Sequence, residues 1–242
     1  MLLVACARPQ TQPQTAPDAQ TLIDQAIAAH GGAHYTQTRL AFRFRGVTYT
    51  ARRDGGAYSY SHTWAQGDSV ITDVLDNAGF RRSIDGQPVT VPDSMATKYS
   101  ASVNSVLYFA LLPYGLNDPA VRKTYLGEVV LRDTAYHKVQ VTFAQEGGGE
   151  DYDDVYVYWI RADSFYVDYL AYAFVEDSGG LRFRKAYHPH TVGGIRFQNY
   201  ENYAAGLRDY AVGALDSAYL AGALRPLSRV ELDSIVVQPS AR

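Results

Sequence analysis

The chain has 242 residues, of which 47% are hydrophobic, and a formal net charge of −3. This composition excludes an intrinsically disordered chain, and the lack of a basic excess argues against nucleic acid as a partner. The only cysteine, Cys6, excludes an intrachain disulfide. The sequence holds no run approaching the ~18 consecutive apolar residues of a membrane-spanning helix, so any membrane attachment must have another basis.

The N-terminal segment gives the first functional signal. Cys6 closes an apolar run at residues 3–5, and this arrangement resembles a bacterial lipobox, in which the cysteine thiol receives a diacylglycerol and becomes the new N-terminus. A secretory signal normally includes an apolar stretch of roughly 7–15 residues, so we expect the complete signal to begin upstream of Met1. The alternative is a chance apolar N-terminus with one stray cysteine. Several acyl chains at Cys6 would anchor the protein stably to a membrane.

Residues 7–17 contain three prolines and three glutamines but no large apolar side chain. Such a segment cannot bury enough surface to fold. We therefore expect residues 1–17 to be a truncated lipoprotein signal and tether, and residues 18–242 to form a single domain. The expected location is the cell envelope, with the domain held at the periplasmic face or the cell surface.

The next segment, residues 18–30, is expected to form a helix. Leu22, Ile23, Ala26 and Ile27 recur at helical spacing, and two glycines follow at residues 31–32. A glycine pair at this place is typical of a helix C-terminus.

From residue 39 the apolar period changes to two, which indicates strands. Turn signals rich in glycine, aspartate and asparagine separate the successive runs. The expected strands cover residues 39–45, 57–65, 69–75, 80–84, 125–132, 136–143, 155–160, 165–175, 181–187 and 194–203.

One further helix is expected between the strands, at residues 95–112, where it ends before Pro113. It is apolar around much of its circumference near its end, so we expect the sheet to enclose it and to bury Leu107, Phe109, Leu111 and Leu112. The predicted fold class is mainly β (α+β): a strongly curved antiparallel sheet, or incomplete β-barrel, around one apolar helix.

Several strings of residues carry a resemblance to a known family. They are VNSVLYF at 103–109, LPYGLND at 112–118, GGGED at 147–151 with YW at 158–159, and RFR at 182–184. With these strings, nearly the whole domain is similar to a family of uncharacterised bacterial lipoproteins. The resemblance implies the fold of the outer-membrane lipoprotein carriers LolA and LolB, an incomplete antiparallel β-barrel that holds acyl chains under helical cover. Carrier function follows from this only by analogy of fold.

Two pairs of arginines stand at strand spacing: Arg43 with Arg45, and Arg182 with Arg184. If they point into a half-barrel, their planar guanidinium groups could hold a carboxylate or phosphate head group. The favoured alternative is that they face water or pair with acidic residues such as Glu201 and Asp168. The aromatic candidates for lining an apolar cavity are Tyr108, Trp159, Phe183 and Phe197.

The oxygen ligands of a dense acidic stretch at residues 146–154 could hold a hard cation such as calcium, although the stretch lacks the ligand order of an EF-hand loop. The pair His188 and His190 is a second candidate metal site. With Asp151 or Asp154, the two imidazoles could supply a nitrogen and oxygen ligand set of the kind that zinc or iron uses. The simpler interpretation is a solvated hairpin turn and a strand end marked by Pro189. We therefore expect no metal and no other cofactor.

Three functions remain open at this stage. The favoured one is a non-catalytic envelope lipoprotein that binds a lipid-like or other apolar ligand. The second is a metal-assisted hydrolase or other enzyme using the acidic loop and the histidine pair. The third is a structural or partner-binding envelope protein without a ligand cavity.

The lipobox makes a direct prediction. With the complete upstream signal restored, the Cys6→Ser variant should move from the membrane fraction to the soluble fraction, because the acylated thiol is lost. Fractionation and labelling with a radioactive fatty acid measure this. A wild-type protein that takes up no label and is already soluble would contradict the prediction.

Overall fold

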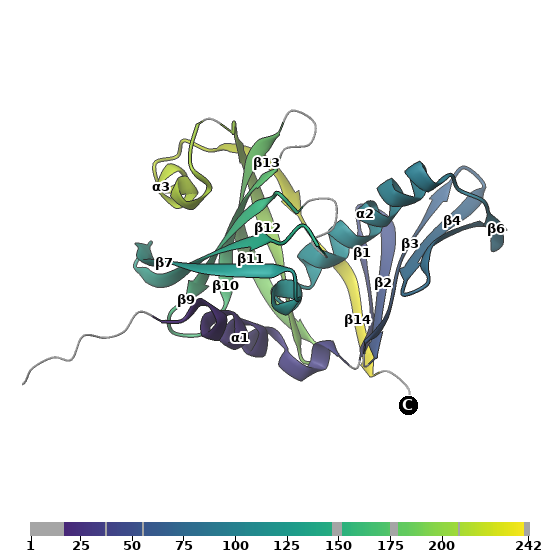
Figure 1. The fold of residues 1–242 in the computed structure, drawn as a ribbon, viewed down its shortest axis with the longest axis horizontal. Coiled ribbons are helices and arrows are strands. Elements are labelled where there is room, and N and C mark those ends of the chain that lie inside the picture. The colour runs from purple at the N-terminus through teal and green to yellow at the C-terminus, as the bar shows by residue number, and fades with distance from the viewer. Residues whose placement is uncertain are drawn as a thin grey trace, which may run out of the picture.

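The computed structural model describes residues 17–36, 38–54, 56–146, 152–174, 179–207 and 209–239. Two seven-stranded antiparallel sheets make up most of it. Figure 1 shows the two sheets inclined to one another, with one long helix crossing the opening between them. The fold is mainly β, as expected, but it consists of two open sheets rather than one curved sheet.

Sheet A is built from the N-terminal strands and the last strand of the chain. Its spatial order is β14 (Asp233–Pro239), β1 (Thr38–Phe44), β2 (Val47–Asp54), β3 (Ala57–Gln66), β4 (Ser69–Asp76), β5 (Gly79–Ile84) and β6 (Gln87–Val89). Sheet B has the order β13 (Arg225–Val230), β12 (Ile195–Ala205), β11 (Gly180–Val192), β10 (Val167–Phe174), β9 (Val155–Arg161), β8 (Thr134–Phe143) and β7 (Val121–Leu131).

Helices connect and cover the sheets. The α-helices are α1 (Ala19–His30), α2 (Asp93–Ala110) and α3 (Leu215–Leu220), and the 3₁₀ helices are η1 (Gly32–Tyr35), η2 (Tyr114–Asn117) and η4 (Val212–Ala214). The first helix is confirmed: Asp18 caps it by accepting a hydrogen bond from the Thr21 backbone at 3.0 Å. The residue after α1 is a glycine, Gly31, because a Cβ atom at this position would lie only 3.3 Å from the Ile195 backbone of β12.

The register of sheet A separates an aromatic inner face from a polar outer face. Phe42 pairs with Tyr49, and Tyr49 pairs with His62, so these rings lie on one face, towards α2. On the other face, the Thr50 and Ser61 hydroxyls lie 2.7 Å apart. The period-two pattern read from the sequence therefore places the phenylalanines of β1 inward and its arginines outward.

The central strands of sheet B, β9 and β10, are buried on both faces, unlike the strands of sheet A. Tyr158 and Leu170 face inward to the core that includes α1. Trp159 and Phe183 face outward and pack under α3. The outer cover is fixed by Asp216 of α3, whose Oδ2 accepts from the Trp159 Nε1 at 3.0 Å and from Lys138 Nζ at 2.8 Å.

Helix α2 differs from the expectation of an enclosed apolar helix. Only Val103 and Leu107 of this helix are buried, and most of its first half is exposed. Leu111 and Leu112, just beyond it, are buried as expected, whereas Phe109 is half-buried. The reason is that polar residues occupy much of the helix surface, so α2 lies against sheet A along one side.

The N-terminal half of α2 is docked on sheet A by an ion-pair cluster. The fully buried carboxylate of Asp73 accepts from the Arg82 Nε at 2.6 Å and from the His62 Nε2 at 2.8 Å. The Arg82 guanidinium in turn lies 3.7 Å from the centre of the Tyr99 ring of α2. A cation held this way contributes more than an exposed pair because water is excluded from it.

The packing of α2 predicts its contribution to stability. Truncating Leu107, which is 1% exposed, to Ala should lower the free energy of unfolding by roughly 2–5 kcal/mol. The matched control on the same helix is Met95→Ala, since Met95 is 38% exposed and its loss should cost less than about 0.5 kcal/mol. Urea denaturation measures both. Equal losses of stability in Leu107→Ala and Met95→Ala would contradict the docking of α2 through the side that carries Leu107.

The buried His30 at the end of α1 predicts an acid-sensitive fold. It is 1% exposed, its Nδ1 donates to the Ala26 carbonyl at 2.9 Å, and burial lowers its pKa to about 4. The ordinary pKa of a histidine is 6.5, so between about pH 4 and pH 6.5 the folded state binds fewer protons than the unfolded state.

Because the pKa of His30 is lowered in the folded state, the free energy of unfolding decreases as the pH falls. Stability from neutral His30 is fully present above about pH 6.5 and is lost as the pH falls towards about 4, by about 3 kcal/mol. The His30→Gln variant should lack this component. A stability difference between wild type and variant that stays constant from pH 7 to pH 4 would refute it.

Candidate functional site

Helix α2 divides the space between the sheets into two cavities. Cavity 1 has a volume of about 880 Å³ and cavity 2 of about 500 Å³. Ser105 and Phe109 of α2 line both, so the helix forms the wall between them. Both volumes are in the range of small-molecule sites, roughly 300–1,000 Å³.

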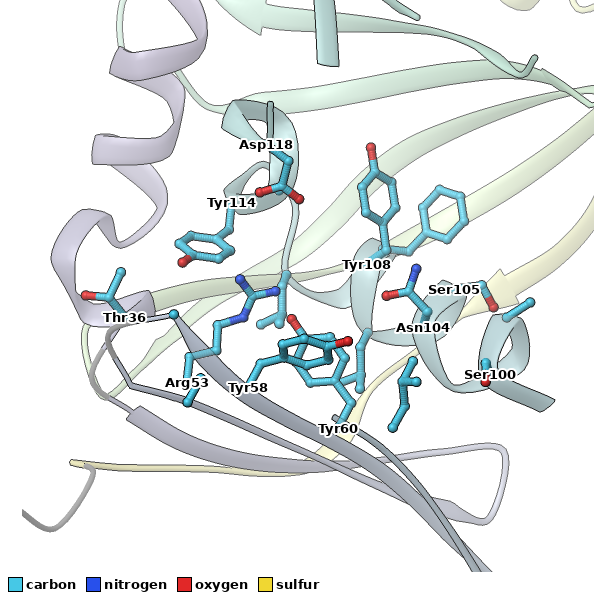
Figure 2. A pocket seen from close by; sticks show the side chains of 18 of the residues that line it. Thr36, Arg53, Tyr58, Tyr60, Ser100, Asn104, Ser105, Tyr108, Tyr114 and Asp118 are labelled. Carbon is cyan, nitrogen blue, oxygen red and sulfur yellow. The ribbon is translucent and has the colours of Figure 1, made fainter. Parts of the chain in front are cut away.

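Cavity 1 lies between the inner face of sheet A, α2 and the segment around η2. Figure 2 shows Tyr58 and Tyr60 rising from sheet A on one side, with Tyr108 of α2 and Tyr114 of η2 on the others. Its apolar lining residues are Leu75, Leu107, Phe109, Leu111 and Phe143. The cavity thus combines apolar walls with a ring of phenols.

One end of cavity 1 is charged. The Arg53 guanidinium lies 4.3 Å from the centre of the Tyr114 ring and 5.1 Å from that of Tyr60. Asp118 lies on the same side (Figure 2), and burial raises the pKa of its carboxyl while Arg53 opposes the rise. A polar ligand group would therefore meet both signs of charge here.

The phenols of cavity 1 continue into the core of sheet B. The Tyr108 and Tyr158 hydroxyls lie 3.2 Å apart, and burial raises the pKa of both. Tyr156 stacks on Tyr172 with ring centres 5.2 Å apart. The raised pKa keeps Tyr108 and Tyr158 protonated at neutral pH, so these two residues offer aromatic surface and hydroxyl hydrogen bonds rather than bases or nucleophiles.

The residues proposed from the sequence separate into distinct places. Tyr108 lines cavity 1, and Arg45 and Arg184 line cavity 2. Trp159 and Phe183 lie on the outer face of sheet B, in the core under α3, away from both cavities.

Three further candidates also lie outside the two cavity linings. Phe197 is buried beside Val103 and Leu107 of α2. Arg43 is exposed on the outer face of sheet A. Arg182 is half-buried, with its Cζ 4.6 Å from the centre of the Phe174 ring.

The candidate metal ligands are not brought together. Asp151 and Cys6 lie outside the described residues. Ala173 of β10 pairs with Val155 on one side and with Leu181 on the other, so Val155 and Leu181 lie at the same height in the sheet. Asp154 comes just before Val155, whereas His188 lies seven residues beyond Leu181 on β11. At about 3.3 Å per residue this places them roughly 20 Å apart along the strands. In the described part of the chain no three His, Cys, Asp or Glu side chains could hold a metal ion.

The strand around the histidines also differs from the expectation. β11 continues to Val192, and the register shifts between Tyr187 and His190. His188 has φ of 45°, and both imidazoles are exposed. Pro189 is therefore accommodated in an irregularity within the strand rather than ending it.

Sequence reasoning missed most of cavity 1. Arg53 lies on β2, a strand that the sequence did not indicate, and Tyr114 and Asp118 lie at η2, which reads as a loop. Tyr58 and Tyr60 did carry a signal, since they alternate with Ser59 in β3.

Comparison with known protein families assigns the chain to a family. A family described as "Family of unknown function (DUF6503)" matches residues 36–231. A comparison with curated proteins finds no match.

Among solved structures, a LolA superfamily protein from Nitrosomonas europaea is similar with a TM-score of 0.50 and 10% identity over 94% of each chain. A DUF1329 family protein from Desulfovibrio piger has a TM-score of 0.44 and 10% identity over 93% of this chain and 95% of that chain. A putative outer membrane lipoprotein-sorting protein domain from Vibrio parahaemolyticus has a TM-score of 0.43 and 6% identity over 84% of this chain and 99% of that chain. The first of these shows a LolA-like fold, as the resemblance in the sequence implied.

Proposed function

The chain belongs to the DUF6503 family of unknown function, and we propose that it is a non-catalytic envelope lipoprotein that binds a lipid-like or other apolar ligand. The ligand occupies the space on either side of α2, with cavity 1 as the main site. The domain is held at a membrane through lipidated Cys6. None of the described helices is long and apolar enough to span a membrane.

The observation that carries the proposal is the unfilled volume of cavity 1. A cavity of about 880 Å³ that is partly open to solvent is a concave site of the size that small molecules occupy. Its walls carry aromatic and aliphatic side chains together with polar ones, among them Asn104 and Ser105 of α2 and, at the charged end, Arg53 and Asp118. This combination is typical of a site for an apolar small molecule.

The LolA-like fold supports the same proposal. The sequence resemblance is to uncharacterised lipoproteins and implies the fold of the LolA and LolB carriers, which holds acyl chains. Two sheets with a helix across the opening give such a chain a place to enter. Substitutions that fill the cavity without disturbing its walls therefore provide the sharpest test.

Asn104 is suited to such a test because it is exposed on α2 and lines cavity 1. The Asn104→Trp variant should fill part of the cavity and lower the affinity for a fluorescent fatty-acid probe by about tenfold or more, equivalent to about 1.4 kcal/mol. The matched control is Ser102→Trp, an exposed position two residues away that is absent from the described lining. Thermal melts show whether both variants fold.

The outcomes separate the hypotheses. Saturable binding to wild type and to Ser102→Trp, weakened in Asn104→Trp, supports the proposal. Absence of binding to wild type across fatty acids and neutral lipids would overturn it. Equal binding to all three proteins would place the ligand outside cavity 1.

A further inference from the structure

We propose that cavity 2 binds the anionic head group of an amphiphile, a carboxylate or phosphate joined to an apolar chain, on the guanidinium of Arg184. This inference rests on the proposed function and specifies the chemistry of the ligand. It assigns the head group to the opposite side of α2 from cavity 1.

Arg184 is a buried cation. It lies on β11, where it pairs with Leu170 and Asn202 on the neighbouring strands, and is 8% exposed. The phenylalanine ring of Phe109 covers it, with the guanidinium carbon 4.0 Å from the ring centre. Because a buried charge loses its hydration, a side chain in this position normally has an anionic partner.

That partner is missing from the described protein. The Arg184 Nη2 donates to the neutral Tyr172 hydroxyl at 3.0 Å, and the Nε finds no hydrogen-bond acceptor among the described residues. A guanidinium carries five N–H donors in a planar fork. The arrangement therefore leaves donors of a buried cation available to a ligand.

The charges around cavity 2 have one sign. Its described lining contains Arg45 and Arg184 but neither aspartate nor glutamate. The adjacent Arg182, Lys185 and Glu201 are absent from this lining, and Lys185 and Glu201 pair with each other at 3.2 Å. An anion entering cavity 2 thus meets attraction without a competing carboxylate on its walls.

Two further polar side chains of β12, Asn202 and Gln198, line the cavity, and each has a buried oxygen without a partner among the described residues. Asn202 donates its amide to the Ser228 hydroxyl at 3.2 Å, which leaves its Oδ1 without a partner among the described residues. Rotating this amide by half a turn would let Oδ1 accept from Ser228 and turn the two N–H donors towards the cavity. The Oε1 of Gln198 also has no donor in the described part of the chain, but its Nε2 already donates to the Val167 carbonyl and to the Tyr200 hydroxyl, so this side chain offers an anion no free donor.

The remaining walls accommodate an apolar chain rather than a free ion. They are formed by Phe44, Val106, Leu227, Val230 and Leu232. An inorganic anion would leave this surface uncovered, whereas an amphiphile satisfies the guanidinium and the apolar walls together. Arginine suits the head group because its planar fork matches carboxylate and phosphate oxygens in pairs.

The test compares ligands that share a chain and differ in head group. Isothermal titration of the full chain with decanoate, decyl phosphate, decan-1-ol and inorganic phosphate measures the contribution of the charge in the wild-type protein. Both anionic amphiphiles should bind about tenfold or more tightly than decan-1-ol, because charge-assisted hydrogen bonds are stronger than neutral ones. This arm needs no variant, so it stands even where a substitution at a buried site impairs folding.

Variants then assign the preference to Arg184. Arg184→Gln should reduce the preference for the anionic head to about twofold or less, whereas Arg184→Lys should retain part of it. The matched control is Arg182→Gln, two residues away on the same strand face but outside the lining of cavity 2, and it should bind like wild type. Circular dichroism establishes that each variant is folded.

Each outcome decides between the alternatives. Equal affinity of wild type for decanoate and decan-1-ol overturns the anionic head while leaving the proposed function intact. Absence of binding by all three amphiphiles overturns both. Tight, Arg184-dependent binding of inorganic phosphate with no gain from a chain would make the ligand a small anion and overturn the amphiphile. A head-group preference unchanged in folded Arg184→Gln overturns the assignment to Arg184.

Discussion

Helix α2 is the helix that crosses the opening between the two sheets, and it leaves part of each apolar inner face uncovered although α1 also packs against sheet B. Sheet A presents the aromatic face of Phe42, Tyr49 and Tyr60, and sheet B presents Tyr156 and Tyr172. Helix α2 buries only Val103 and Leu107 completely, so it cannot fill the space between faces that diverge. The two cavities are the volume that remains, and their aromatic lining is the uncovered part of the two cores.

Among the described residues, two buried carboxylates, Asp73 and Asp216, have cationic partners that tie the structure together, whereas the buried cation Arg184 has no anionic partner. Asp73 has Arg82 and His62 as partners, and Asp216 has Lys138 and Trp159. Each of these clusters connects a helix to a sheet, which offsets the desolvation of its charges. Arg184 contacts the hydroxyl and ring of Tyr172 and the ring of Phe109, and no anionic partner offsets its desolvation among the described residues, which is why we propose a ligand there.

The sequence predicted which face of a strand points inward where one face is polar, but it could not do so where both faces are covered. The alternation of β1 predicted Phe42 inside and Arg43 outside, because sheet A has a solvated outer face. In β11 the same reasoning favoured Phe183 as a cavity residue and Arg184 as a surface residue. Sheet B is covered on both sides, so Phe183 packs under α3 while Arg184 faces the interior. No local pattern distinguishes those two arrangements, since α3 is a short helix that the sequence did not indicate. The strand β2 was missed although Val47, Tyr49 and Ala51 alternate with Thr48, Thr50 and Arg52, because Arg53 places a charge on the apolar face, where it lines cavity 1.

Phe109 makes the two sides of α2 interdependent. Its ring lines both cavities, covers the Arg184 guanidinium at 4.0 Å and packs against Tyr172 with ring centres 5.4 Å apart. The ring therefore forms part of the wall between the cavities and covers the guanidinium at the same time. The size of cavity 1 and the electrostatic exposure of Arg184 are therefore set by the same side chain, which couples the apolar and the charged parts of the site.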